Sequence, residues 1–231
     1  MEGALRDLID TPIYTTTNIS HIHGWSTAYV RKGLSYRLLW NPEDLNIVQK
    51  IDNQIVASYR DFIFLDIFHF FTEKGFTPKR RSSLLHHLAK NEDLFYKPEF
   101  ELATDGAEVF RKQSFGQEIY DGVNIETTQI SFLEFFEPIL ERRIFSAQKA
   151  VFSWQIDAKF PDIIIHPAIA FGKPHIRGHR IKSELLFDIH TARKASAKEI
   201  AQEYEIENIS LVQQAINFEM IRNETQKAAL D

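Results

Sequence analysis

One stretch near the C-terminus holds the strongest structural signals: Ile163-Ile164-Ile165-His166-Pro167-Ala168-Ile169-Ala170-Phe171-Gly172-Lys173-Pro174-His175-Ile176-Arg177-Gly178-His179-Arg180-Ile181. Its opening run of β-branched residues predicts a buried strand, which Pro167 ends. Gly172 and Gly178 predict two tight turns after it, because glycine adopts backbone conformations that other residues avoid. We therefore expect a short hairpin held on a hydrophobic strand.

The expected hairpin carries four cationic side chains and no acidic one: Lys173, Arg177, Arg180 and Lys182. Two interpretations of this charge are open. The first is a solvated turn held by two glycines, and the second is a surface that binds an anion or a carboxylate-rich partner. Arginine suits the second, because its guanidinium binds carboxylates through paired, charge-assisted hydrogen bonds.

The residue spacing in this stretch is that of a known domain family. The pattern P-x-I-x-x-G-x-P-x-I-x-G-x-R-I runs from Pro167 to Ile181 and precedes a helix and a helix-turn-helix. It resembles a bacterial and archaeal family of domains of unknown function, DUF433, from Ile164 to Glu219. The common form of that family has Gly-Thr-Arg where this chain has Gly178-His179-Arg180.

Such domains occur in VapB-like antitoxins, so the resemblance implies the antitoxin of a type II toxin–antitoxin module. It implies two partners, the DNA of the chain's own promoter and a PIN-like ribonuclease toxin. Arg177 and Arg180 in the hairpin, or Arg222 and Lys227 near the chain end, would meet the carboxylates of the ribonuclease. The alternative is a scaffold or oligomerisation protein, or a stand-alone transcriptional regulator without a toxin partner.

Composition narrows the class of protein. The chain has 231 residues, 44% of them hydrophobic, which is enough for a substantial core. It has no cysteine, which excludes disulfides, thiolate metal sites and cysteine nucleophiles. Its start carries Glu2, Asp7 and Asp10 rather than a signal sequence, and it has no apolar run of about 18 residues. We therefore expect a cytoplasmic protein that does not span a membrane.

Charge is unevenly distributed along the chain, whose net charge is −5. Residues 1–90 hold 11 Lys/Arg and 9 Asp/Glu, a balance of +2, and the remainder holds 16 and 23, a balance of −7. Thr11 to Pro42 contains no acidic residue. A polyanion such as DNA would therefore meet the first third of the chain or the basic hairpin.

The front of the chain predicts a DNA-reading module. Thr15 to Gly24 predicts a short helix, although its three threonines also suit a strand, and a second short helix ends at Gly33. Two short helices joined at a glycine form a helix-turn-helix, and the layout is similar to that of MerR-like winged helices. Leu34 to Trp40 and Ile55 to Tyr59 would pair as the wing. The residues offered to DNA are Ser26, Thr27, Arg31, Lys32 and Arg37.

The middle of the chain predicts a mixed region with no evident linker. Asp61 to Lys74 predicts an amphipathic, Phe-rich helix, and Thr77 begins another. Glu99 to Lys112 predicts a hairpin, and Ser131 to Leu140 predicts a helix that opens with a capping box. Short strands are expected at 144–145 and 150–154.

Three helices are expected to close the chain, starting near Ser183, Ser196 and Ser210, the last two with capping boxes. The last two helices again outline a helix-turn-helix. Residues 196–231 carry three Lys/Arg against seven Asp/Glu, however, and phosphate would repel them. Gln213, Gln214 and Asn217 give the final helix an uncharged outward face, so we expect a homodimer through the C-terminal domain.

The sequence carries no signature of catalysis or metal binding. Its nine histidines lack ligand spacing, and no acid close in sequence completes a set with His175 and His179. It has no G-x-S-x-G, P-loop or G-x-G-x-x-G motif. Acidic residues distant in sequence that meet as a nuclease cluster are the alternative left open. We expect a protein that is not an enzyme and uses no metal or other cofactor.

Together these observations predict an α+β fold that is mostly α. We expect a winged helix-turn-helix over residues 1–90 and a linking α+β region over 91–160. A β-hairpin followed by three helices is expected over 161–231.

Overall fold

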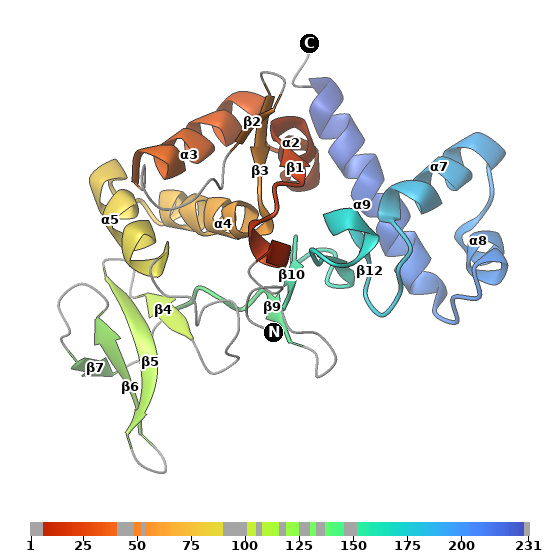
Figure 1. Cartoon of the computed structure of the whole chain (residues 1–231). Helices are drawn as coiled ribbons and strands as arrows, with labels where there is room; N and C mark the ends of the chain where they lie inside the picture. Colours follow the sequence, from red (N-terminus) through yellow and green to blue (C-terminus); the bar gives the residue numbers. More distant parts are fainter. Residues whose placement is uncertain are drawn as a thin grey trace. The chain divides into compact units, whose positions relative to one another are not determined.

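The computed structural model describes residues 7–40, 49–51, 54–89, 101–104, 108–115, 119–124, 130–132, 137–145 and 152–228 (Figure 1). The chain forms two compact units. The first unit contains Met1–Lys32, Asn46–Phe62 and Ser153–Asp231, and the second contains Gly33–Leu45 and Ile63–Phe152. Both ends of the chain belong to the first unit, so the units cut across the three predicted segments.

The described residues form an α+β fold that is mostly helical, as predicted. The first unit contains β1 (Tyr14–Thr15), α2 (Thr16–His23), the start of α3 (Thr27–Trp40), β2 (Gln49–Ile51), β3 (Gln54–Ala57), the start of α4 (Tyr59–Glu73), β10 (Ser153–Gln155), β11 (Ile163–Ile165), η1 (Ala170–Gly172), β12 (His175–Ile176), α7 (Ser183–Arg193), α8 (Ala197–Glu203) and α9 (Ile209–Ala228). None of the described helices is both long and apolar enough to cross a lipid bilayer.

Helix α2 begins and ends where the sequence predicts. The Thr15 hydroxyl accepts from the Asn18 amide at 3.1 Å, and the Asn18 side chain accepts in return from the Thr15 amide at 3.1 Å. This reciprocal cap satisfies amides that the first helical turn leaves without partners. Gly24 ends the helix in the left-handed conformation, with φ of 72°.

Helix α3 is longer than the sequence predicts. Ser26 caps it, because its hydroxyl accepts from the Tyr29 amide at 3.2 Å. The helix does not end at Gly33, and the strand expected from Leu34 to Trp40 is wrong, since these residues continue the helix. A Cβ on Gly33 would lie 2.2 Å from Leu65 Cδ1. The glycine therefore permits close packing inside the helix rather than ending it.

The predicted wing is wrong in its pairing. Strand β3 lies between β1 and β2 in an antiparallel sheet, with Tyr14 opposite Ala57 and Lys50 opposite Ile55. The segment that contains Arg37 is helical and contributes no strand to that sheet. The side chain of Arg37 lies outside the described residues.

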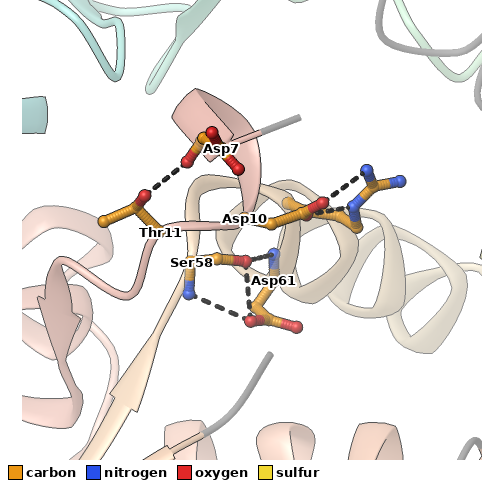
Figure 2. Close-up of polar contacts among 6 residues, drawn as sticks. Asp7, Asp10, Thr11, Ser58 and Asp61 are labelled. Atoms are coloured by element: carbon orange, nitrogen blue, oxygen red, sulfur yellow. Dashed lines mark hydrogen bonds and ion pairs between the residues drawn. The ribbon is translucent and has the colours of Figure 1, made fainter. Parts of the chain in front are cut away.

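The start of α4 is fixed by polar contacts in the first unit (Figure 2). The Ser58 amide and hydroxyl donate to Asp61 Oδ2 at 3.0 and 2.8 Å, and the Ser58 hydroxyl accepts from the Asp61 amide at 3.2 Å. Arg60 donates to both carboxylate oxygens of Asp10, at 2.6 and 3.1 Å. The buried Arg60 is thus paired with Asp10, and the buried Asp61 is hydrogen-bonded by Ser58.

The second unit contains the rest of α3 and α4, α5 (Pro78–Ala89), β4 (Leu102–Thr104), β5 (Val109–Phe115), β6 (Ile119–Asn124), β7 (Ile130–Phe132), β8 (Glu137–Pro138) and β9 (Arg143–Ile144). The Phe-rich face of α4 is core, as expected, since Phe64, Phe68 and Phe71 are buried. The predicted hairpin is confirmed as the antiparallel pair β4 and β5.

The helix expected from Ser131 to Leu140 is wrong. Ser131 lies opposite Gly122 in the ladder of β6 and β7, and Glu137 lies opposite Thr104 in the ladder of β4 and β8. Pairing between strands uses the backbone groups that a helix would need, so the capping signal at Ser131 does not prevail. The turn of the β4–β5 hairpin, residues 105–107, lies outside the described residues.

The C-terminal part of the first unit follows the predicted order of a hairpin and three helices. Strands β10, β11 and β12 pair antiparallel, with Trp154 opposite Ile165 and Ile164 opposite His175. Helix α9 packs against α7, α8, β11 and β12. The cap at Ser196 is confirmed by reciprocal bonds with Glu199, whose pKa these bonds lower.

The capping box predicted at Ser210 is wrong. Helix α9 begins one residue earlier, at Ile209. Its cap is Asn208, whose Oδ1 accepts from the Ser210 amide at 3.0 Å. Asparagine side chains reach the backbone two residues on, and they are favoured at helix starts for this reason.

Candidate functional site

The predicted DNA-binding residues surround the start of α3. Ser26 and Thr27 are exposed at its first turn, and Arg31 and Lys32 are exposed one turn further along. The first turn of α3 holds no acidic residue. The structure therefore brings four of the five predicted residues to one helix terminus, and the fifth, Arg37, follows on the same helix.

A buried carboxylate on α9 holds α2. Glu219 is only 2% exposed. Its Oε2 lies 2.8 Å from His21 Nε2 on α2, and its Oε1 accepts a hydrogen bond from the Ser183 hydroxyl on α7. One carboxylate thus joins three helices. The hydrogen bond to Glu219 raises the pKa of the His21 imidazole, and partial burial opposes this effect.

The side chain of Arg222 on α9 lies close to the turn after α2. Arg222 Nη2 lies 2.9 Å from Asp157 Oδ2, and the guanidinium lies 5.0 Å from the centre of the Phe218 ring. A Cβ on Gly24 would lie 2.9 Å from Arg222 Nη1. Gly24 therefore serves both the left-handed end of α2 and its close approach to α9.

Stacked aromatic rings flank the same turn. The His23 ring stacks on Trp25, with ring centres 3.9 Å apart and planes 6° apart, and on Phe62 at 4.5 Å. Trp25 in turn meets Tyr29 edge-on at 5.4 Å. Rings in these arrangements stabilise beyond their buried area. The residues that lead into α3 are thus packed against the first unit.

The predicted hairpin forms, and it contains a strained turn. Ala170, Phe171 and Gly172 all have positive φ, of 50°, 56° and 73°. Such values cost energy in alanine and phenylalanine. The Tyr14 hydroxyl donates to the Gly172 carbonyl at 2.9 Å in a buried bond. This turn leaves the Phe171 side chain 85% exposed.

The four cations of the hairpin have different surroundings. Arg177 Nε lies 3.5 Å from Asp162 Oδ1, and its guanidinium also donates to the Pro161 carbonyl. The Lys182 ammonium lies 5.5 Å from the centre of the Phe171 ring. Arg180 is exposed, and Lys173 is half-buried. The two hairpin arginines therefore differ, because Arg177 is paired with Asp162 and bonded to the Pro161 carbonyl.

The rival cations near the chain end also differ. Arg222 belongs to the contact with Asp157 and is largely buried, with 12% of its side chain exposed. Lys227 is exposed in the last turn of α9. Among the described residues, no three His, Asp or Glu side chains gather as metal ligands.

Sequence reasoning missed two residues of this region. Glu219 follows Val212, Ala215 and Ile216 at helical spacing, so the period of the buried face of α9 could have revealed it. Phe171 had no such signal. Its exposure follows from the backbone of the turn, which the sequence does not specify.

Comparisons with known proteins add a family and a fold. Residues 163–218 match the family model described as "Protein of unknown function (DUF433)". No curated protein matches the chain. The crystal structure of Rv2018 from Mycobacterium tuberculosis has a similar fold, with a TM-score of 0.55 and 14% identity over 90% of this chain and 99% of that one. The predicted resemblance to DUF433 is thus confirmed for the C-terminal part of the chain, residues 163–218.

Proposed function

We propose that the chain is the antitoxin of a type II toxin–antitoxin module and that it binds DNA at its own promoter through the start of α3. The observation that carries the DNA-binding part is the grouping of Ser26, Thr27, Arg31 and Lys32 at one exposed helix terminus. That terminus lies in a segment, Thr11 to Pro42, without an acidic residue.

The physical argument for DNA is electrostatic. The first turn of a helix presents amides without helical partners and the positive end of the helix dipole, both of which favour phosphate. Arg31 and Lys32 add two cations beside it. The contacts between α2 and α9 order the helix that precedes this surface, which lowers the ordering cost of binding. The proposal includes that α2 and α3 act as a helix-turn-helix similar to that of MerR-like proteins.

The hairpin is proposed as the surface that neutralises a PIN-like ribonuclease. Arg180 is the better candidate of its two arginines, since it is exposed while Arg177 is paired with Asp162. At the chain end, Arg222 is paired with Asp157, which leaves Lys227 as the exposed cation there. The antitoxin is proposed to act as a homodimer in the cytoplasm.

An electrophoretic shift assay on the promoter of the chain's own gene tests DNA binding. Wild-type protein is compared with Arg31→Ala/Lys32→Ala, and we expect the double variant to bind more weakly. A charge-matched control is Lys79→Ala/Lys159→Ala, which removes two exposed lysines that lie outside α2 and α3. Equal DNA binding by all three proteins would show that Arg31 and Lys32 of α3 do not contribute to DNA binding.

Co-expression with the proposed PIN-like ribonuclease tests whether the chain neutralises that enzyme. We expect Arg180→Ala to restore toxicity while circular dichroism stays unchanged. Truncation after Met220 is a poor test of the chain end, because it removes the structural residue Arg222 together with Lys227. Lys227→Ala is the cleaner comparison. Protection by every variant would assign neutralisation to other residues. Failure of the wild-type chain to protect would favour the second candidate, a stand-alone regulator or scaffold.

A further inference from the structure

Phe171 is an unusual side chain to leave in water. It is 85% exposed, more than the other large apolar side chains that the structure exposes: Leu185, Ile209, Met220 and Ile221. Its backbone is fixed in the left-handed region by the neighbouring turn, and the buried bond from Tyr14 to Gly172 holds that turn. Because the backbone is already ordered, burial of this ring by a partner costs less conformational entropy than burial of a ring on a flexible segment.

A cation lies beside this ring. The Lys182 ammonium lies 5.5 Å from the ring centre. The segment from Ile163 to Lys182 contains no acidic residue. A surface that buries Phe171 therefore also contacts the Lys182 ammonium. An apolar site with acidic residues at its rim would complement both side chains.

The same unit contains a groove of that kind between α8 and α9. Its volume is about 580 Å³, and it is open to solvent. Ala201, Ile206 and Ile209 supply apolar lining, while Glu205 and Glu207 supply two carboxylates. Lys198 also lines the groove, so its three charged residues sum to −1.

We propose that the chain self-associates by inserting Phe171 of one copy into the α8–α9 groove of a second copy. Shape and charge both support this occupant: an apolar ring with a cationic neighbour faces an apolar groove with two carboxylates. The ring cannot fill the groove of its own copy, because a ring seated there would not be 85% exposed. Two copies related by a two-fold axis would make the contact twice and close the assembly.

This inference rests on the proposed homodimer but places it on a different surface from the uncharged face of α9. Multi-angle light scattering of the full chain, from micromolar to about a hundred micromolar, decides whether copies associate. A wild-type monomer over that range would overturn both the homodimer and this contact. DNA binding by α3 is measured separately and survives that outcome.

The location of the contact is tested by substitution. Phe171→Asn removes the ring and keeps a residue that tolerates positive φ. We expect it to weaken association by about 30-fold or more, the loss typical of an interface hot spot. The matched variant is Met220→Ala/Ile221→Ala, which trims two exposed apolar residues of α9. If that variant dissociates the protein and Phe171→Asn does not, the inference is wrong and α9 is the interface.

A charge exchange identifies the second copy as the occupant. Arg180→Glu/Lys182→Glu and Glu205→Lys/Glu207→Lys should each associate weakly alone. Mixed together, each hairpin meets a groove of opposite charge, so heterodimers should form with near wild-type affinity. Failure of the mixture to associate, with both proteins folded by circular dichroism, would overturn the proposed pairing. A Phe171-dependent complex with a different protein and no self-association would do the same.

Discussion

The imidazole of His21 meets the carboxylate of Glu219 at 2.8 Å, although 198 positions separate the two residues in the chain. This contact joins α2, near the N-terminus, to α9, near the C-terminus. The same carboxylate accepts from Ser183, so the DUF433-matched part and the proposed DNA-binding helices share one buried anion.

Stability should depend on pH through this pair. The hydrogen bond to Glu219, and to a lesser extent the charge of Glu184, raises the pKa of His21 in the folded state. The bound proton therefore stabilises the fold fully below the unfolded pKa of about 6.5, and that contribution is lost as pH rises through the higher folded value. Urea unfolding between pH 6 and 9 should show the free energy of unfolding falling with pH.

The matched variants for that experiment are His21→Gln and Glu219→Gln. His21→Gln removes the imidazole, Glu219→Gln removes the carboxylate that raises its pKa, and each keeps a side chain that can hydrogen-bond. Both should flatten the decline above pH 6.5. A decline of undiminished slope in His21→Gln would assign the pH dependence to other groups.

Gly172 should be far less tolerant of alanine than Gly178. Both have positive φ, but a Cβ on Gly172 would lie 2.6 Å from Ile13 Cδ1 and from the Tyr14 hydroxyl, whereas one on Gly178 meets nothing within 4 Å. Gly172→Ala should lower the free energy of unfolding by about 2–4 kcal/mol, and Gly178→Ala by about 1 kcal/mol. Equal losses in thermal unfolding would show that the turn yields to the added methyl group.

The salt dependence of binding tests the phosphate contacts proposed for α3. Each contact contributes a slope of about 0.9 to the fall of log affinity with log salt. Arg31→Ala/Lys32→Ala should therefore reduce that slope by about 1.8 if both cations touch phosphate. Fluorescence anisotropy on promoter DNA at several salt concentrations measures it. An unchanged slope with weaker binding would point to base contacts instead.

Arg222 should matter for stability and Lys227 should not. Arg222→Met loses the pair with Asp157 and the contact with the Phe218 ring, at a cost of about 1–2 kcal/mol. Lys227→Met changes an exposed side chain near the end of α9 and should leave urea unfolding within experimental error. Equal stabilities would mean that Arg222 is held without benefit to the fold.

Local signals in the sequence predicted local structure well. Thr15 and Gly24 bound α2, Ser196 caps α8, and the β-branched run at Ile163 forms a strand, because each depends on neighbours within a few residues. The spacing from Pro167 onward also indicated the family of the C-terminal part.

The predictions from sequence were wrong where contacts between residues distant in the chain determine the local structure. Gly33 has the residue type of a helix end, yet its proximity to Leu65 makes it an interior packing position. Ser131 carries a capping signal, but its strand partner lies around Gly122. The four residues at the start of α3 were predictable, since they follow a capped helix and a turn. The exposure of Phe171 and the burial of Glu219 depend on tertiary structure.

The discontinuous first unit has a consequence for synthesis of the protein. A ribosome adding about 5–20 residues per second needs roughly 10–40 s to cover the distance from His21 to Glu219. During that time α2 leaves the ribosome before the helix that carries its partner Glu219 has been made. A product that terminates before Glu219 lacks the carboxylate that pairs with His21. If the proposed function holds, such a product should bind promoter DNA more weakly than a chain that includes α9.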